Sequence, residues 1–232
     1  MKGNPNINVI ILAAGQSKRA KKDKIFFKIN GRNLIEIVID KFAHAEKVTK
    51  IILVLSKRNL KRKIKFSGDK NLVIVKGGET RIESLINASK FLDKNCDAVM
   101  VHDGARPFIS IDMINRFSKL ALKHNCVIPF IPLKDTVKKI DIKTGKVIKT
   151  IDRNSHFAVQ TPQCYKFSVF KKIIIAAQKN KNATDDSQIA EKLSIPVFGA
   201  LGEENNIKIT TPIDLEIAKI IFHIPFKPQK HL

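Results

Sequence analysis

The chain has 232 residues, of which 44% are hydrophobic and 28% are charged, so it can bury a core and is too apolar for wholesale disorder. Its formal net charge of +22 favours anionic ligands. No apolar run approaches the roughly 20 residues of a transmembrane helix, and the opening residues lack the apolar segment of a signal peptide. We therefore expect a cytoplasmic protein with no membrane partner.

The basic charge does not by itself indicate a nucleic-acid-binding protein. Most of the 43 basic residues are Lys, and they are spread along the whole chain. The 14 Phe and one Tyr mostly lie in apolar contexts rather than between cations, where they could stack on bases. We expect no nucleic-acid partner, and a basic nucleic-acid-binding α/β protein is the alternative from another functional class.

The first stretch with a functional pattern is a buried strand that ends in small residues and cations. Residues 9–13 are apolar without alternation, which predicts a strand covered on both faces. Ala14 and Gly15 leave backbone N–H groups open to a ligand, and Arg19 and Lys24 add positive charge. This pattern suits a triphosphate, although it matches neither common glycine-rich nucleotide fingerprint. The alternative is an ordinary turn with surface cations.

Strands and helices then alternate along the chain. Helices are expected at 33–44, from a cap at Thr80, and at 111–123, and strands at 51–55, 72–75, 98–101 and 127–131, with a short extended piece at 26–29. This spacing predicts an α/β fold, a doubly wound sheet with helices on both faces. The glycine loops that follow three strands should meet at the carboxyl edge of the sheet, where such folds bind ligands.

The pattern changes after residue 133. Polar and apolar residues alternate over 136–152 on both sides of Gly145, which predicts a basic β-hairpin that leans on another subunit. Strands at 157–159, 197–200 and 207–210 and helices at 167–179, 186–193 and 212–222 complete the prediction. No linker interrupts the chain, so we expect one domain over 1–232, in which 133–154 form a β-arm for dimerisation.

Two further strand-end loops carry candidate site residues. Gly78 lets the backbone approach a flat ligand, and Ser84 could bond a base edge, although a capped glycine turn is the alternative. Asp103 could hold a ribose hydroxyl or Mg²⁺, whereas its pairing with Arg106 as a surface ion pair is the alternative. His102 is expected to be a core residue without chemistry.

Taken together, the motifs and their order resemble one enzyme family. They lie at 12–19 (Leu-Ala-Ala-Gly-Gln-Ser-Lys-Arg), Lys24, 77–84, 101–107 (Val-His-Asp-Gly-Ala-Arg-Pro), 135–136, 152–154, 161–163, 184–185 and 206–210. Over about residues 7–222 the sequence resembles the 2-C-methyl-D-erythritol 4-phosphate cytidylyltransferases of the non-mevalonate isoprenoid pathway.

The resemblance implies a Rossmann-like, mostly parallel sheet of the nucleotide-diphospho-sugar transferase type, and a homodimer with an exchanged arm. It implies CTP as co-substrate and Mg²⁺ as cofactor, with Asp103 as the metal ligand. It also implies catalytic roles for Arg19, Lys24, Arg153 and Lys208, nucleotide binding by Ala13, Ala14, Gly15, Gly78, Ser84, Asp103, Gly104 and Arg106, and substrate binding by Thr136, Arg153, Thr161, Thr184 and Lys208. Arg153 and Thr136 would act in the partner's site.

The implied reaction joins CTP to 2-C-methyl-D-erythritol 4-phosphate and releases pyrophosphate. A phosphate monoester has a second pKa of about 6, so the nucleophile needs no general base. Ribitol 5-phosphate is the alternative acceptor. A third alternative is a family member that binds CTP without turnover, because Asp23 and Ile25 depart from the usual pattern. Asp23 adds a negative charge beside Lys24, which would weaken CTP binding.

Overall fold

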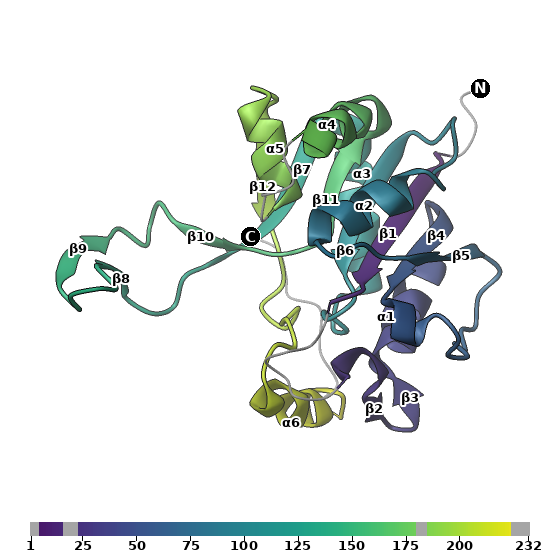
Figure 1. Cartoon of the computed structure of the whole chain (residues 1–232), viewed down its shortest axis with the longest axis horizontal. Helices are drawn as coiled ribbons and strands as arrows, with labels where there is room; N and C mark the ends of the chain where they lie inside the picture. The colour runs from purple at the N-terminus through teal and green to yellow at the C-terminus, as the bar shows by residue number, and fades with distance from the viewer. Residues whose placement is uncertain (1–4, 16–22, 180–184, 224–232) are drawn as a thin grey trace.

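The computed structural model describes residues 5–15, 23–179 and 185–223. An eight-stranded sheet forms its centre, in the order β10-β7-β11-β6-β1-β4-β5, with β12 also paired to β7 (Figure 1). The strands are β1 (Ile7–Ala13), β4 (Val48–Leu55), β5 (Asn71–Lys76), β6 (Ala98–Asp103), β7 (Cys126–Pro132), β10 (Phe157–Val159), β11 (Gln163–Lys166) and β12 (Val197–Leu201). Only β10 and β11 run antiparallel to their neighbours, so the mostly parallel sheet is confirmed.

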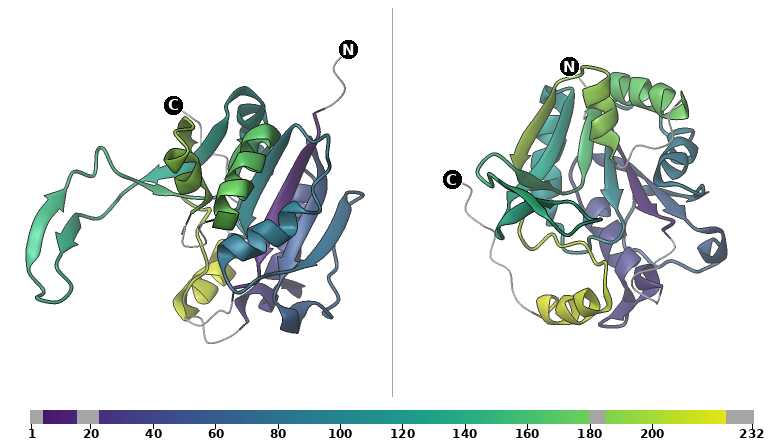
Figure 2. Two further views of the ribbon diagram at one scale, coloured as in Figure 1. Left: turned by 45° about the horizontal axis from the view of Figure 1, so that its top comes forward. Right: turned by 60° about the vertical axis from the view of Figure 1, so that its left-hand side comes forward.

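Helices cover both faces of this sheet, as the doubly wound pattern predicts (Figure 2). One face is packed by α1 (Leu34–Ala43) and α3 (Ile111–Lys123), and the other by α2 (Arg81–Ser89), α4 (Phe167–Lys179) and α5 (Asp186–Lys192). The lack of alternation in β1 has a direct cause: Val9 and Ile11 enter the first core, while Ile10 enters the second.

A smaller layer lies below the carboxyl edge of the sheet. It consists of α6 (Pro212–Ile221), the 3-10 helix η2 (Lys24–Phe26) and the short hairpin of β2 (Lys28–Ile29) and β3 (Arg32–Asn33). Ile29, Ile209 and Leu215 share a small apolar core there. Part of the extended piece expected at 26–29 is therefore helical, and the strand expected at 207–210 is wrong. That segment is irregular and bonds the β6 loop through a single backbone N–H, from Ile209 to the carbonyl oxygen of Ala105.

The predicted hairpin forms a sheet of its own, made of β8 (Val137–Ile140) and β9 (Val147–Ile151). It projects from the body of the protein (Figure 1). The turn uses Gly145 at φ +71°, a conformation that favours glycine. Ile142 at the tip is 96% exposed, so the arm has no packing partner within the described part of the chain there. None of the described helices is long and apolar enough to span a membrane.

Candidate active site

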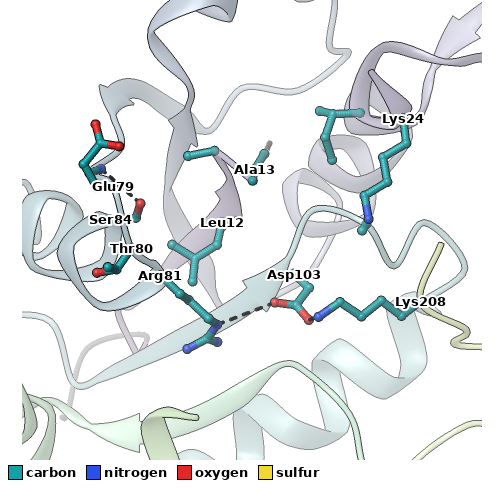
Figure 3. Close-up of a pocket in the computed structure, with 14 residues that line it drawn as sticks. Leu12, Ala13, Lys24, Glu79, Thr80, Arg81, Ser84, Asp103 and Lys208 are labelled. Atoms are coloured by element: carbon teal, nitrogen blue, oxygen red, sulfur yellow. Dashed lines mark hydrogen bonds and ion pairs between the residues drawn. The ribbon is translucent and has the colours of Figure 1, made fainter. Parts of the chain in front are cut away.

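The carboxyl ends of the central parallel strands meet around one pocket. The N–H of Gly104, after β6, donates to the carbonyl oxygen of Leu12 in β1 at 2.9 Å, and the N–H of Gly77 donates to that of Leu55 in β4 at 2.9 Å. The first bond joins the Gly104 loop to β1, the second joins the Gly77 loop to β4, and residues of all three glycine loops line the pocket, as expected. The described residues that line the pocket are Leu12, Ala13, Ala14, Gly15, Lys24, Ile25, Gly78, Glu79, Thr80, Arg81, Ser84, Asp103, Ala105 and Lys208 (Figure 3).

One wall of the pocket is backbone from the loop after β5. A Cβ on Gly77 would lie 2.4 Å from the Cβ of Ala14, so only glycine lets this loop touch the loop after β1. The N–H of Gly78 donates to the hydroxyl oxygen of Ser84 at 3.1 Å. This bond leaves the hydroxyl proton of Ser84 for a ligand. The two loops therefore pack closely into one wall, and the Ser84 hydroxyl in this wall can donate a hydrogen bond to a ligand.

Asp103 lies in the pocket between Arg81 and Lys208 (Figure 3), and Arg106 of its own loop is a third cation nearby. Its carboxylate oxygens lie 2.7 Å from Nζ of Lys208, 3.8 Å from Nε of Arg106 and 3.9 Å from Nε of Arg81. Burial alone would raise the pKa of Asp103, but the charges of Lys208 and Arg81, with a smaller contribution from Arg106, lower it to about 2. The carboxylate therefore stays ionised, and it fixes the position of Lys208.

Arg81 links the pocket to a buried carboxylate that the sequence interpretation did not assign. Its guanidinium bonds Asp186, the first residue of α5, which is fully buried. Burial raises the pKa of Asp186, and the charge of Arg81 opposes that rise. The two residues are 105 positions apart, so no local pattern predicts the pair. The only available signal was the position of Arg81 inside the motif at 77–84.

A chain of hydrogen bonds lies directly beneath Asp103. The N–H of Asp103 donates to the hydroxyl oxygen of Thr161 at 3.1 Å, and that hydroxyl lies 3.1 Å from Nδ1 of His102. Nε2 of His102 lies 3.2 Å from the carbonyl oxygen of Arg106, which can only accept. Nε2 therefore carries the proton of a neutral ring, and the Thr161 hydroxyl donates to Nδ1.

This chain changes the interpretation of Thr161. The side chain is buried below the pocket and is not among the described residues that line it. Its hydroxyl accepts from the N–H of Asp103 and donates to Nδ1 of His102. Thr161 therefore supports Asp103 from below, whereas the resemblance implied that Thr161 contacts the substrate. His102 is a buried core residue, as expected, and burial lowers its pKa to about 4 even though the Asp103 charge acts in the opposite direction.

Two lysines from distant segments reach the same edge of the pocket. Nζ of Lys24 donates to the carbonyl oxygen of Ile209 at 2.7 Å, one residue after Lys208. The segment is held in turn by Arg106, whose guanidinium donates to the carbonyl oxygen of Asn206 at 2.8 Å. Arg106 thus positions the Lys208 segment and does not line the pocket.

The remaining predicted residues fall into three groups. Arg19 and Thr184 lie outside the described residues. Gly104 lies behind the pocket, where a Cβ would come within 3.0 Å of the Cβ of Ala13. Thr136 and Arg153 are exposed at the base of the arm and do not line the pocket of their own chain. Arg153 donates to a backbone carbonyl of the arm itself, that of Lys134, at 3.1 Å.

The pocket does not fit a resident metal ion. The described residues contain no group of three His, Cys, Asp or Glu side chains that could hold one. Asp103 and Glu79 are the carboxylates of the described lining, and Asp103 is already paired with Lys208. The donor set fits only a Mg²⁺ that is carried by substrate phosphates and takes one carboxylate oxygen from the protein.

Comparison with known proteins decides the family. The family described as 2-C-methyl-D-erythritol 4-phosphate cytidylyltransferase matches residues 7–223. The chain belongs to this family. A curated cytidylyltransferase of this name from Dictyoglomus thermophilum is 40% identical over 212 residues, covering 89% of this chain and 92% of the relative. One from Clostridioides difficile is 36% identical over 227 residues, covering 94% of each chain.

A solved structure agrees with this family. The 4-diphosphocytidyl-2C-methyl-D-erythritol synthase from Anaerococcus prevotii is 30% identical, with a TM-score of 0.82 over 95% of this chain and 100% of that one. The resemblance inferred from the motifs is therefore confirmed, and the chain is a cytidylyltransferase, a nucleotidyltransferase enzyme. The relatives support neither ribitol 5-phosphate as the acceptor nor a nucleic-acid-binding protein.

Proposed function

We propose that this enzyme transfers the cytidylyl group of CTP to 2-C-methyl-D-erythritol 4-phosphate, giving 4-diphosphocytidyl-2-C-methyl-D-erythritol and pyrophosphate, in the cytoplasm. The observation that carries the proposal is the pocket, which places a backbone wall, an ionised carboxylate and two lysines at one edge of the sheet. Such a pocket suits a nucleoside at one end and phosphates at the other.

The nucleoside would lie against the wall formed by Ala14, Gly78 and Ser84. Their backbone and hydroxyl groups provide donors and acceptors for the edge of a base, and the glycine allows close contact with its plane. Asp103 would accept hydrogen bonds from the ribose hydroxyls, because its carboxylate stays ionised in the pocket. The phosphates would then extend toward Lys24 and Lys208.

The chemical step is an attack of an acceptor phosphate oxygen on the α-phosphorus of CTP. A new P–O bond forms, the bond to the bridging oxygen breaks, and pyrophosphate leaves with that electron pair. The nucleophile is already anionic, so the task of the protein is to bring two polyanions together. Lys24 would neutralise the α-phosphate as charge develops, and Lys208 would position the acceptor phosphate. Mg²⁺ that arrives with CTP would neutralise further phosphate charge, with Asp103 as its protein ligand.

The arm supplies the second part of the proposal. Thr136 and Arg153 are exposed at its base, and neither lines the pocket of its own chain. We infer a homodimer in which each arm crosses to the partner, so that these two residues contact the acceptor in the partner's pocket. An isolated two-stranded hairpin with exposed apolar residues is only marginally stable in water, which favours such packing.

A pyrophosphate-release assay tests this function. Each of the four nucleoside triphosphates is offered with 2-C-methyl-D-erythritol 4-phosphate or with ribitol 5-phosphate, in the presence of Mg²⁺ or of a chelator. We expect release only with CTP, the methylerythritol acceptor and Mg²⁺ together. Equal or faster release with ribitol 5-phosphate, or no release with any pair, would contradict the proposal.

A further inference from the structure

The sequence suggested that the negative charge of Asp23 would weaken CTP binding. In the structure, the carboxylate of Asp23 contacts two residues of another segment. Its Oδ2 accepts a hydrogen bond from Nδ2 of Asn59 at 2.9 Å and lies 3.5 Å from the guanidinium of Arg58. Both partners belong to the 3-10 helix η3 (Lys57–Asn59), which follows the central strand β4. The carboxylate is 17% exposed and does not line the pocket.

The contact fixes the point at which the chain enters η2. Asp23 immediately precedes this helix, and its carbonyl oxygen accepts the N–H of Phe26 at 3.1 Å. Lys24 is the first residue of the helix. The bond to Asn59 therefore ties the backbone of Lys24 to the end of β4, while the bond from Nζ of Lys24 to Ile209 holds the other end of the side chain.

The hydrogen bond is the stronger part of this contact. Asn59 is only 2% exposed, so losing its acceptor leaves a buried amide donor unpaired. Arg58 is 56% exposed, and its ion pair with Asp23 is long and screened by solvent. The helix itself does not depend on the contact, because Ile25 and Phe26 anchor it in the core at 3% and 9% exposure.

We propose that Asp23 is a positioning residue for Lys24, and that it acts through its hydrogen bond to buried Asn59 rather than through its charge. The inference rests on the proposed function, because it takes Lys24 as the group that neutralises the α-phosphate. It reverses the expectation from the sequence. A carboxylate beside the phosphate site no longer weakens CTP binding but holds the lysine that meets the phosphate.

Two substitutions separate the hydrogen bond from the charge. Asp23→Asn removes the charge and keeps an oxygen that can accept from Asn59, whereas Asp23→Ala removes both. We expect Asp23→Ala to lower kcat about tenfold with little change in the KM for CTP, since small misplacements of a catalytic group are costly. Asp23→Asn should stay within about twofold of the wild type, because the acceptor remains. Asp69→Ala, at a side chain that is 89% exposed, is the matched control and should have no effect.

The opposite outcomes are distinct. If the charge of Asp23 repels the phosphates, both variants will lower the KM for CTP by the same factor, and the inference is overturned. Wild-type kinetics of Asp23→Ala would overturn it as well. If the wild type itself releases no pyrophosphate from CTP, the proposed function is wrong, and this result is distinguishable from a failure of the inference about Asp23.

A second variant covers the case in which Asp23→Ala does not fold. Asn59→Leu removes the donor from the other side of the same bond, at similar volume. We expect it to lower kcat about as much as Asp23→Ala, and the double variant should lose no more than either single change. Thermal unfolding of each variant establishes that folded protein is compared. Independent, multiplicative losses in the double variant would contradict action through this bond.

Discussion

The pocket and the arm hold their cations in different ways. In the pocket, Lys208 pairs with Asp103, and Nζ of Lys24 is fixed on a backbone carbonyl. On the arm, Lys139 and Lys149 lie directly opposite each other across β8 and β9, an arrangement that is unfavourable for like charges. Within the described residues, Arg153 donates a hydrogen bond to the arm's own backbone and to no other segment.

This difference indicates where the site is complete and where it is not. The pocket residues are preorganised by contacts within one chain, which lowers the cost of binding a polyanion. Thr136 and Arg153 on the arm are exposed, and the described part of the chain does not cover them. We therefore propose that the site has two halves, one built within each chain and the other supplied by the partner of the proposed homodimer.

The largest effect is expected in the pocket half. Lys24→Ala should lower kcat by about 10²–10³-fold, because the variant loses a positioned charge at the point where we propose that the phosphorus is attacked. Lys28→Ala is the matched control, since Lys28 is exposed on β2 and should be silent. Pyrophosphate release at saturating substrates measures both variants. Wild-type turnover by Lys24→Ala would contradict the role proposed for Lys24 in neutralising the α-phosphate.

The arm half should respond in a different parameter. Arg153→Ala should raise the KM for the acceptor by about 10–100-fold, the range for losing a hydrogen bond to a charged group. The KM for CTP should not change, because we place the nucleotide in the pocket and away from the arm. Lys143→Ala, near the hairpin turn, serves as the control for charge alone. An equal rise in both KM values would break the division of the site into two halves.

A smaller effect is expected below the pocket. Thr161→Val keeps the shape of the side chain but removes the hydroxyl between Asp103 and His102, and it should lower kcat/KM about tenfold. Thr161→Ser restores the hydroxyl and should recover most of the activity. Wild-type kcat/KM in Thr161→Val would show that the hydrogen-bond chain does not matter, because valine keeps the methyl group and lacks only the hydroxyl.

The smallest effect concerns pH. The pKa of Asp103 is lowered to about 2 in the folded protein, from an ordinary value of 3.8. Its contribution to stability is therefore complete above about pH 4 and is lost only as the pH falls through about 2. The pair with Lys208 should persist at every pH used for assay. The carboxyl carbon signal of Asp103, assigned by its absence in Asp103→Asn, should titrate with a midpoint near pH 2, and a midpoint at the ordinary value of 3.8 or above would contradict the pairing.

Much of the fold follows from sequence pattern. The helix expected at 111–123 is α3, the strand expected at 157–159 is β10, and the hairpin is β8 and β9. Strand β11 was not predicted, because its four residues combine polar and apolar side chains and fit into the sheet only through tertiary pairing with β6 and β7. The wrong strand at 207–210 has a similar cause: alternation predicts extension, but the segment finds no ladder to join.

The residues of the site also differ in whether the sequence alone identifies them. The glycine loops, Asp103, Lys24 and Lys208 could be named because they follow strands or stand in recognisable motifs. The Arg81–Asp186 pair and the contact of Asp23 with Asn59 could not, because each joins segments that only the fold brings together. The charge of Asp23 was therefore interpreted by its neighbour in sequence, while its partner in space was unknown.

A mixed dimer shows whether one site is shared by two chains. Lys24→Ala and Arg153→Ala chains carrying different tags are co-expressed, and the dimer with both tags is isolated and assayed at low acceptor concentration. One of its two sites would combine an intact pocket with an intact arm, so we predict about half of the wild-type activity per dimer. Activity no higher than the mean of the two variant homodimers would show that each arm serves its own pocket, and would contradict the account.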